Sequence, residues 1–159
     1  MAVFSGRYVN TVDRKGRVSV PASFRAVLTG QGQGVQPIAA FPTPSGSPSL
    51  DCCGLDWLEQ LSERFSSANI YQPEVETAAL VTLGEAQQLP FDPEGRILLP
   101  ASLIEHAGLQ GKAAFVGLGR RFQIWNPETL EAVREEARAR APAILPTLNL
   151  PPLPGGGGR

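Results

Sequence analysis

The chain reads TVDRKGRVSVPASF at residues 11–24 and FDPEGRILLPASL at residues 91–103. Aligned without gaps from Asp13 and from Asp92, twelve positions hold six identical residues, and three further pairs are apolar in both copies. Chance can produce a short match, but this one is gapless and has similar surroundings in both places. We therefore interpret it as one structural unit that the chain uses twice.

Each copy predicts a strand, a tight turn, a returning strand and a short helix. In the first copy, Asp13 and Gly16 take the first and fourth positions of the turn, where Asp accepts hydrogen bonds from following amides and Gly adopts positive φ. Residues 3–13 and 17–20 flank the turn and predict a β-hairpin, because apolar and polar residues alternate in 17–20. A proline follows and favours a helix near 21–29.

The rest of the chain predicts further elements by the same criteria. The second copy predicts a strand at 86–91, a turn at 92–95, a strand at 96–99 and a helix from Pro100 to Gly108. Elsewhere we expect a loop at 30–49 around a weak strand at 35–41, a helix at 55–66, a connector at 67–76, a helix or strand at 77–83, strands at 112–118 and 121–125, and a helix at 127–140.

These elements predict a β-rich α+β protein with two modules, at residues 1–76 and 77–140. A single hairpin is only marginally stable in water. We therefore expect the two copies to pack about a pseudo-twofold axis and to share a barrel-like core with short flanking helices. Residues 141–159 are rich in Pro and Gly, and we expect them to be disordered.

The charges are unevenly distributed, although the formal net charge is only −1. Residues 1–35 hold five basic residues and one acidic residue, whereas residues 36–79 hold one basic and six acidic residues. A basic patch on a nearly neutral protein fits a polyanionic partner. A solvated basic face without any partner is the alternative.

Few residues suggest catalysis or metal binding. The single histidine, His106, falls in an expected helix, and the sequence has no metal-ligand spacing, nucleophile elbow or phosphate-binding loop. Cys52 and Cys53 are adjacent, which suits a reducing compartment, and we expect a small buried pair beside an irregular loop.

The first residues do not resemble a signal peptide, and no apolar run approaches the roughly 18 residues of a membrane span. We therefore expect a cytoplasmic protein with no cofactor, no membrane contact and no small-molecule substrate.

The first turn carries the strongest candidate for a binding site. It presents Arg14 and Lys15 to solvent, with Arg17 beside them. Such a tip can contact phosphates and enter a major groove, which admits a two-stranded ribbon, and Arg can bind the O6/N7 edge of guanine. For Asp13 and Arg17 the alternative is an ion pair that only stabilises the turn.

The second turn has lost this basic character. Pro93 and Glu94 stand where the first turn has Arg14 and Lys15. We therefore expect the first copy to contact nucleic acid, and the second copy to build the core and subunit contacts.

Three stretches, NTVDRKGRVSVPASFR, DPEGRILLPASLIEHAGL and GLGRRFQIWNPETL, together resemble the MraZ family of bacterial transcriptional regulators, across roughly residues 1–140. The resemblance implies two tandem AbrB-like (SpoVT/AbrB) modules, a ring-shaped homo-oligomer and association with the nucleoid. It also implies binding of double-stranded DNA at short direct repeats, in the promoter of the division and cell-wall gene cluster.

The resemblance further implies which residues contact DNA. The motif arginine matches Arg17. The DNA-binding set in the first module then comprises Asp13, Arg14, Lys15, Gly16, Arg17, Arg25 and Arg7. The second module offers a weaker set, Asp92, Gly95 and Arg96. Its role is weaker because Ile104 stands where the first copy has Arg25.

Two other functions stay open at this point. The protein could be an oligomeric scaffold that binds RNA or a protein partner through the same basic patch. It could also be a small enzyme that uses Cys52 or His106.

Overall fold

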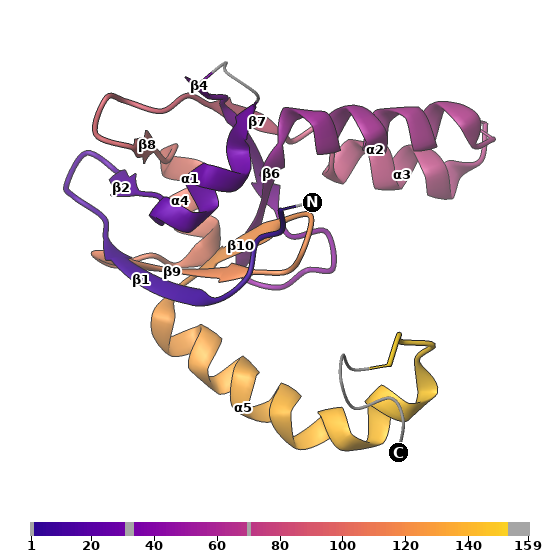
Figure 1. Cartoon of the computed structure of the whole chain (residues 1–159). Coiled ribbons are helices and arrows are strands. Elements are labelled where there is room, and N and C mark those ends of the chain that lie inside the picture. Colours follow the sequence, from indigo (N-terminus) through magenta and orange to yellow (C-terminus); the bar gives the residue numbers. More distant parts are fainter. Residues whose placement is uncertain (1, 31–33, 70, 153–159) are drawn as a thin grey trace. The chain divides into compact units, whose positions relative to one another are not determined.

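The computed structural model describes residues 2–30, 34–69 and 71–152, and it divides into two units, Met1–Pro127 and Glu128–Arg159 (Figure 1). The first unit has an α+β fold with antiparallel strand pairing. Its strands are β1 (Arg7–Thr11), β2 (Arg17–Ser19), β3 (Thr29–Gly30), β4 (Gly34–Val35), β5 (Ile38–Pro42), β6 (Ser49–Gly54), β7 (Gln87–Leu89), β8 (Arg96–Leu98), β9 (Lys112–Gly117) and β10 (Phe122–Trp125). Its helices are α1 (Ala22–Leu28), α2 (Leu55–Ser67), α3 (Pro73–Val81) and α4 (Ala101–Ala107).

The main sheet has the strand order β1-β9-β10-β6-β5-β7. This order reads the same from both ends if each strand is exchanged for its counterpart in the other half of the chain. The strand before the first turn, β1, pairs with β9 of the second half, and the strand before the second turn, β7, pairs with β5 of the first half. The two halves are therefore interlocked within one sheet.

The expectation of a barrel-like core is wrong. Within the described residues the sheet ends at β1 and at β7, which do not pair with each other. The short strands that follow the two turns do not extend this sheet, because they pair with each other instead. The sheet therefore stays open.

The pairing of β2 also corrects the expected first hairpin. Only an isolated bridge, Val12 to Val18, joins the two sides of the first turn as strands. The ladder partner of β2 is β8, with Val18 opposite Ile97. These two residues occupy equivalent positions in the two sequence copies, so the copies meet symmetrically at this pair.

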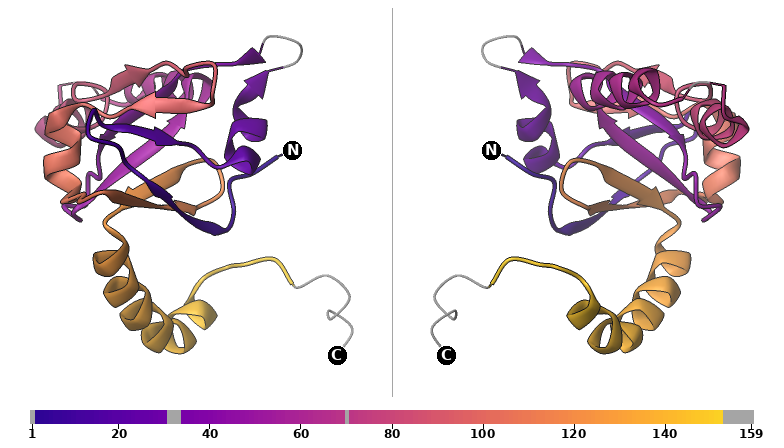
Figure 2. Two further views of the ribbon diagram at one scale, coloured as in Figure 1. Left: turned by 90° about the vertical axis from the view of Figure 1, so that its left-hand side faces the viewer. Right: turned by 90° about the vertical axis from the view of Figure 1, so that its right-hand side faces the viewer.

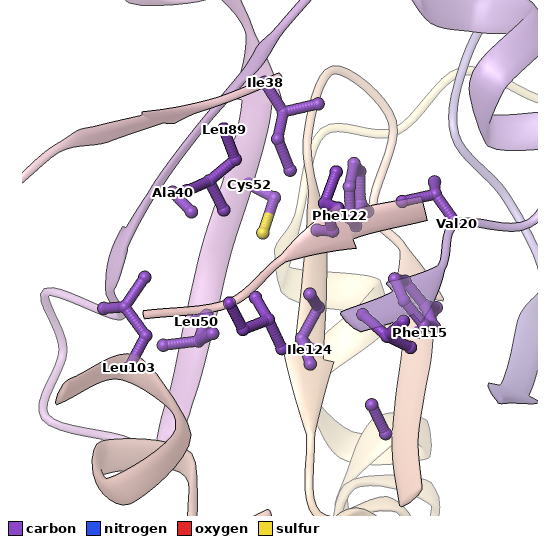
Figure 3. Close-up of a cluster of buried hydrophobic side chains, with 14 of the residues drawn as sticks. Val20, Ile38, Ala40, Leu50, Cys52, Leu89, Leu103, Phe115, Phe122 and Ile124 are labelled. Carbon is purple, nitrogen blue, oxygen red and sulfur yellow. The ribbon is translucent and has the colours of Figure 1, made fainter. Parts of the chain in front are cut away.

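The core lies between this two-stranded ribbon, α1, α4 and the main sheet (Figure 3). Alternation along β2 and β8 turns Val18 and Ile97 inward, where both are almost fully buried. Phe24 from α1 contacts Phe4 and Phe122 at ring-centroid distances of 5.3 Å and 5.0 Å. The apolar residues that the two copies share are thus the residues that build the core.

Other expected elements agree with the structure to different degrees. The helix at 55–66 is α2, and the ambiguous segment 77–83 is largely helix α3, which already begins inside the expected connector. Figure 1 shows α2 and α3 side by side. The weak strand at 35–41 is divided between β4 and β5, and β6 was not expected. The first short helix ends at Leu28, before the glycine expected to close it.

The second unit consists mainly of α5 (Pro127–Ile144) and a 3-10 turn, η1 (Leu145–Thr147). Helical structure therefore continues past residue 140, into the segment expected to be disordered. Residues 153–159 lie outside the described residues. The expected division into modules at 76 and 77 falls inside α3 and stays a prediction.

Candidate nucleic-acid interface

The first turn is organised by one carboxylate. Asp13 Oδ1 accepts hydrogen bonds from the amides of Lys15 and Arg17, both at 2.9 Å, and Oδ2 accepts one from Arg17 Nε at 2.7 Å. The backbone closes the turn, since the Gly16 amide donates to the Asp13 carbonyl at 3.0 Å. Gly16 has a φ of +90°, which residues other than glycine rarely adopt.

The second turn has the same geometry with different side chains. Asp92 Oδ1 accepts bonds from the amides of Glu94 and Arg96, both at 2.9 Å, and Arg96 Nε donates to Oδ2 at 2.8 Å. Gly95 has a φ of +80°. The residues Asp, Gly and Arg that the two copies share are therefore the residues that shape the turn.

The hydrogen bonds also lower the pKa values of the aspartate carboxyls in both turns. The amide of Arg17, followed by its side chain, holds the pKa of the Asp13 carboxyl below its ordinary value, although desolvation opposes the shift. The amide of Arg96 lowers the pKa of Asp92 in the same way. Both carboxylates therefore stay ionised at neutral pH and hold their arginines in place.

The two basic residues at the tip of the first turn differ from these structural residues. Arg14 and Lys15 are exposed, and only the backbone amide of Lys15 takes part in the turn's hydrogen bonds. In the second turn, Pro93 and Glu94 are exposed at the same places. The turns thus share one backbone and present opposite charge at their tips.

Arg17 forms the turn-stabilising ion pair that the sequence left as the alternative, and its side chain stays accessible. Its Nε forms the ion pair with Asp13, while its side chain remains 38% exposed. The pair uses one edge of the guanidinium group, and an Arg side chain carries further N–H donors. Arg17 therefore stabilises the turn and also contributes charge to the surface.

The two turns share one surface because β2 and β8 are paired. Arg17 lies opposite Leu98, and Ser19 lies opposite Arg96. These four residues alternate with the buried pair and so face away from the core. Figure 1 shows both turns on the same side of the unit, the side that faces the viewer in the left panel of Figure 2.

The pKa of Arg96 reports the same proximity. It is raised above its ordinary value, first by the side-chain hydrogen bond to Asp92, and the charge of Asp13 in the other turn adds to the shift. Asp13 therefore lies within electrostatic range of the second turn.

The remaining residues of the expected DNA-binding set lie apart from the first tip. Arg25 donates from Nε to the Val20 carbonyl at 3.1 Å, and its guanidinium lies against Gly95 of the second turn. Arg7 begins β1, at the end remote from the turn, roughly 20 Å along the strand from Asp13. The structure thus brings Arg14, Lys15 and Arg17 together and places Arg25 and Arg7 elsewhere.

The residues considered for catalysis have structural surroundings. Cys52 and Cys53 are buried in β6 within the main sheet, rather than beside an irregular loop. Burial raises the pKa of the Cys53 thiol to about 12 and that of Cys52 well above its ordinary value, which disfavours the reactive thiolate. His106 Nε2 lies 3.2 Å from the Ser47 carbonyl oxygen.

In residues 2–30, 34–69 and 71–152, no group of three or more His, Cys, Asp or Glu side chains is arranged to hold a metal ion. Among the helices of those same segments, none has the length and apolar character to cross a membrane.

Sequence reasoning missed a polar cluster centred on Asp51, a buried residue of the main sheet. Asp51 accepts hydrogen bonds from Thr43 Oγ1 at 2.9 Å, Gln123 Nε2 at 2.8 Å and Arg121 Nε at 3.3 Å. Asp51 lies in β6, which the sequence did not predict, so its burial could not be expected. The cluster satisfies its polar atoms internally and has the character of a structural network.

The family model and the similar proteins that match this chain all carry the same family name. The model of a family described as "MraZ protein, putative antitoxin-like" matches residues 82–146. A transcriptional regulator MraZ from Parvibaculum lavamentivorans is 42% identical over 164 residues, covering 100% of both chains. Proteins of the same name from Rickettsia canadensis and Rickettsia rickettsii are 41% and 42% identical, covering 87% and 82% of this chain and 91% and 86% of their own.

Proposed function

The chain belongs to the MraZ family of transcriptional regulators, and on that premise we propose that it binds duplex DNA through its first turn. The DNA would be the short direct repeats in the promoter of the division and cell-wall gene cluster. The observation that carries the proposal is that the two turns have the same backbone geometry but tips of opposite charge. Only the first combines a rigid backbone with exposed Arg14 and Lys15.

The geometry of the first turn suits groove recognition. The Asp13 hydrogen bonds hold the backbone before DNA arrives, so binding costs less ordering of the turn. Arg14 and Lys15 can then reach base edges or phosphates in a major groove. Arg17, anchored through Nε, offers its outer edge to a neighbouring phosphate.

The second turn has a subordinate role in this proposal. Glu94 accepts a hydrogen bond from Arg96 Nη2 at 3.3 Å, and its carboxylate repels phosphates. Asp92, Gly95 and Arg96 therefore mainly maintain the fold. Arg25 and Arg7 are proposed as outlying phosphate contacts, because each lies away from the first tip.

A ring-shaped homo-oligomer completes the proposed mechanism. One basic tip forms a weak contact, but several tips on one ring can engage successive repeats, and the effective concentration makes the whole complex tighter. We propose a cytoplasmic, nucleoid-associated protein with tandem AbrB-like modules and a binding role rather than a catalytic one.

The test is fluorescence anisotropy with a labelled duplex from upstream of the gene and a scrambled duplex, across a salt series. Arg14→Ala/Lys15→Ala should weaken binding and make the dependence of affinity on salt shallower, because fewer counterions are released. Pro93→Ala/Glu94→Ala is the matched control, since it changes the two equivalent exposed positions of the second turn and leaves the turn-shaping Asp and Arg residues in place. Equal losses in the two variants, or preferential competition by RNA, would contradict the proposal.

A further inference from the structure

The two turns are supported from behind by residues of the opposite copy. The Leu99 amide donates to the Gly16 carbonyl at 2.9 Å, and the Val20 amide donates to the Gly95 carbonyl at 3.2 Å. Leu99 and Val20 are equivalent in the two sequence copies, as are the two glycines. Each turn is thus held by the chain that follows the other turn.

Side chains from the two short helices also contact the turn of the opposite copy. A Cβ added at Gly16 would lie 3.2 Å from Ile104 Cδ1 on α4, and one added at Gly95 would lie 2.6 Å from Arg25 Nη1 on α1. Ile104 and Arg25 also occupy equivalent positions in the two copies. Each helix therefore places the same position directly against the glycine of the other turn.

The difference between these two side chains follows the charge of the turn they support. The first turn already carries three cations, so a guanidinium against Gly16 would be repelled by its neighbours. The second turn contains two carboxylates, Asp92 and Glu94, and only one cation, Arg96, so a guanidinium beside it meets no such repulsion. An apolar residue behind the first turn adds no further positive charge there.

We propose that Ile104 is a positioning residue for DNA recognition by the first turn. It packs against the hydrophobic core on one side and against Gly16 on the other, so it links the position of the tip to the rigid part of the fold. This inference rests on the proposed function, because the turn that Ile104 positions is the proposed DNA contact. Ile104 itself need not touch DNA.

The experiment compares Ile104→Ala with Ile104→Val and with the control Leu58→Ala. Leu58 is a half-buried apolar residue of α2, remote in sequence from both turns. For each variant, the dissociation constants for promoter and scrambled duplexes are measured at several salt concentrations. Amide hydrogen exchange at Leu99 reports the support of the Gly16 carbonyl directly.

Ile104→Ala should reduce discrimination between the duplexes by about tenfold, a loss comparable to one misplaced base contact. Its salt dependence should stay that of the parent, since no cation is removed, and Leu99 exchange should accelerate. Ile104→Val should restore most of the discrimination, and Leu58→Ala should leave it unchanged although it also removes apolar contacts.

Two results would overturn different statements. If the parent discriminates and Ile104→Ala discriminates equally well, the positioning role is wrong and the proposed function stands. If the parent does not discriminate between the duplexes, the proposed function fails. The Leu99 exchange rate then tests separately whether Ile104 supports the first turn. An unchanged exchange rate in Ile104→Ala would then contradict that support as well.

Discussion

Asp13 and Asp92 are the residues on which both turns depend. Each carboxylate accepts two backbone amides and one guanidinium Nε–H, so three donors converge on one side chain. An Asp at the start of each turn was expected from sequence, because its side chain can accept hydrogen bonds from following backbone amides. The shared motif thus mainly fixes the backbone of the turn, and the first copy adds the positive charges of Arg14 and Lys15.

This arrangement predicts a pH dependence of stability. The folded-state pKa of both carboxyls is lowered, so their stabilising contribution is complete above the unfolded-state value of about 3.9 and is lost as pH falls toward the lower folded-state value. Urea midpoints measured from about pH 3 to pH 7, an interval that spans this value, should fall on the acid side.

The matched variants identify the groups responsible. Asp13→Asn/Asp92→Asn should have a lower midpoint at neutral pH and a flatter acid limb than the parent. An acid limb as steep as that of the parent would show that other carboxyls govern the response.

At the level of elements, the β2–β8 ribbon is the feature that joins the two sequence copies. Val18 and Ile97 face each other at its centre and are fully buried, whereas Leu98 on the same strand is 56% exposed. The ribbon therefore has one face in the core and one face available to a partner.

Substitutions along β8 should reveal these two faces. Ile97→Ala removes buried methyl groups and should lower the free energy of unfolding by about 2–5 kcal/mol. Leu98→Ala is the control from the adjacent, outward position and should change it by only about 0.5 kcal/mol. The measurement is urea unfolding at one protein concentration, and similar losses for both variants would contradict the alternation.

Sequence reasoning predicted the local elements of the motif better than their partners. The turns, the buried alternation in β2 and β8 and the Pro-initiated helices all follow from residues close in sequence. The pairing of β2 with β8 could not be predicted, because a hairpin satisfies the same alternation and only tertiary packing decides between them. Strand β6 was missed for a different reason, because it directly follows a segment rich in Gly, Pro and Ser that is typical of a loop.

In the candidate site, too, some positions could be predicted from the sequence and others could not. Exposure of Arg14 and Lys15 was predictable, because the central residues of a tight turn project outward. The position of Arg25 was not predictable, because its guanidinium contacts Gly95 of the other sequence copy, which lies far away in the chain.

At the scale of the whole molecule, the charge is separated along the chain. The first turn is basic, while residues 36–79, which include α2 and most of α3, carry six acidic residues and one basic residue. A phosphate backbone is thus attracted to one part of the surface and repelled by another. In the proposed complex, this asymmetry would favour one orientation of the chain on DNA.

The proposed ring predicts a dependence on repeat number. A duplex with two correctly spaced repeats should bind at least about tenfold tighter than a duplex with one, because the second contact is intramolecular. Changing the spacing should abolish the gain. Sedimentation velocity on the same samples supplies the mass, and a monomer that binds both duplexes equally would contradict the ring.

The central claim is that the tip of the first turn, rather than the shared fold, binds DNA. The most direct measurement is the anisotropy of a promoter duplex titrated with Arg14→Pro/Lys15→Glu, which gives the first turn the tip of the second. Both tips occupy the same backbone geometry, so the variant should fold like the parent. We expect affinity for the promoter duplex to fall by about 10–100-fold, to that of a scrambled duplex. Undiminished, selective binding by the folded variant would contradict the account.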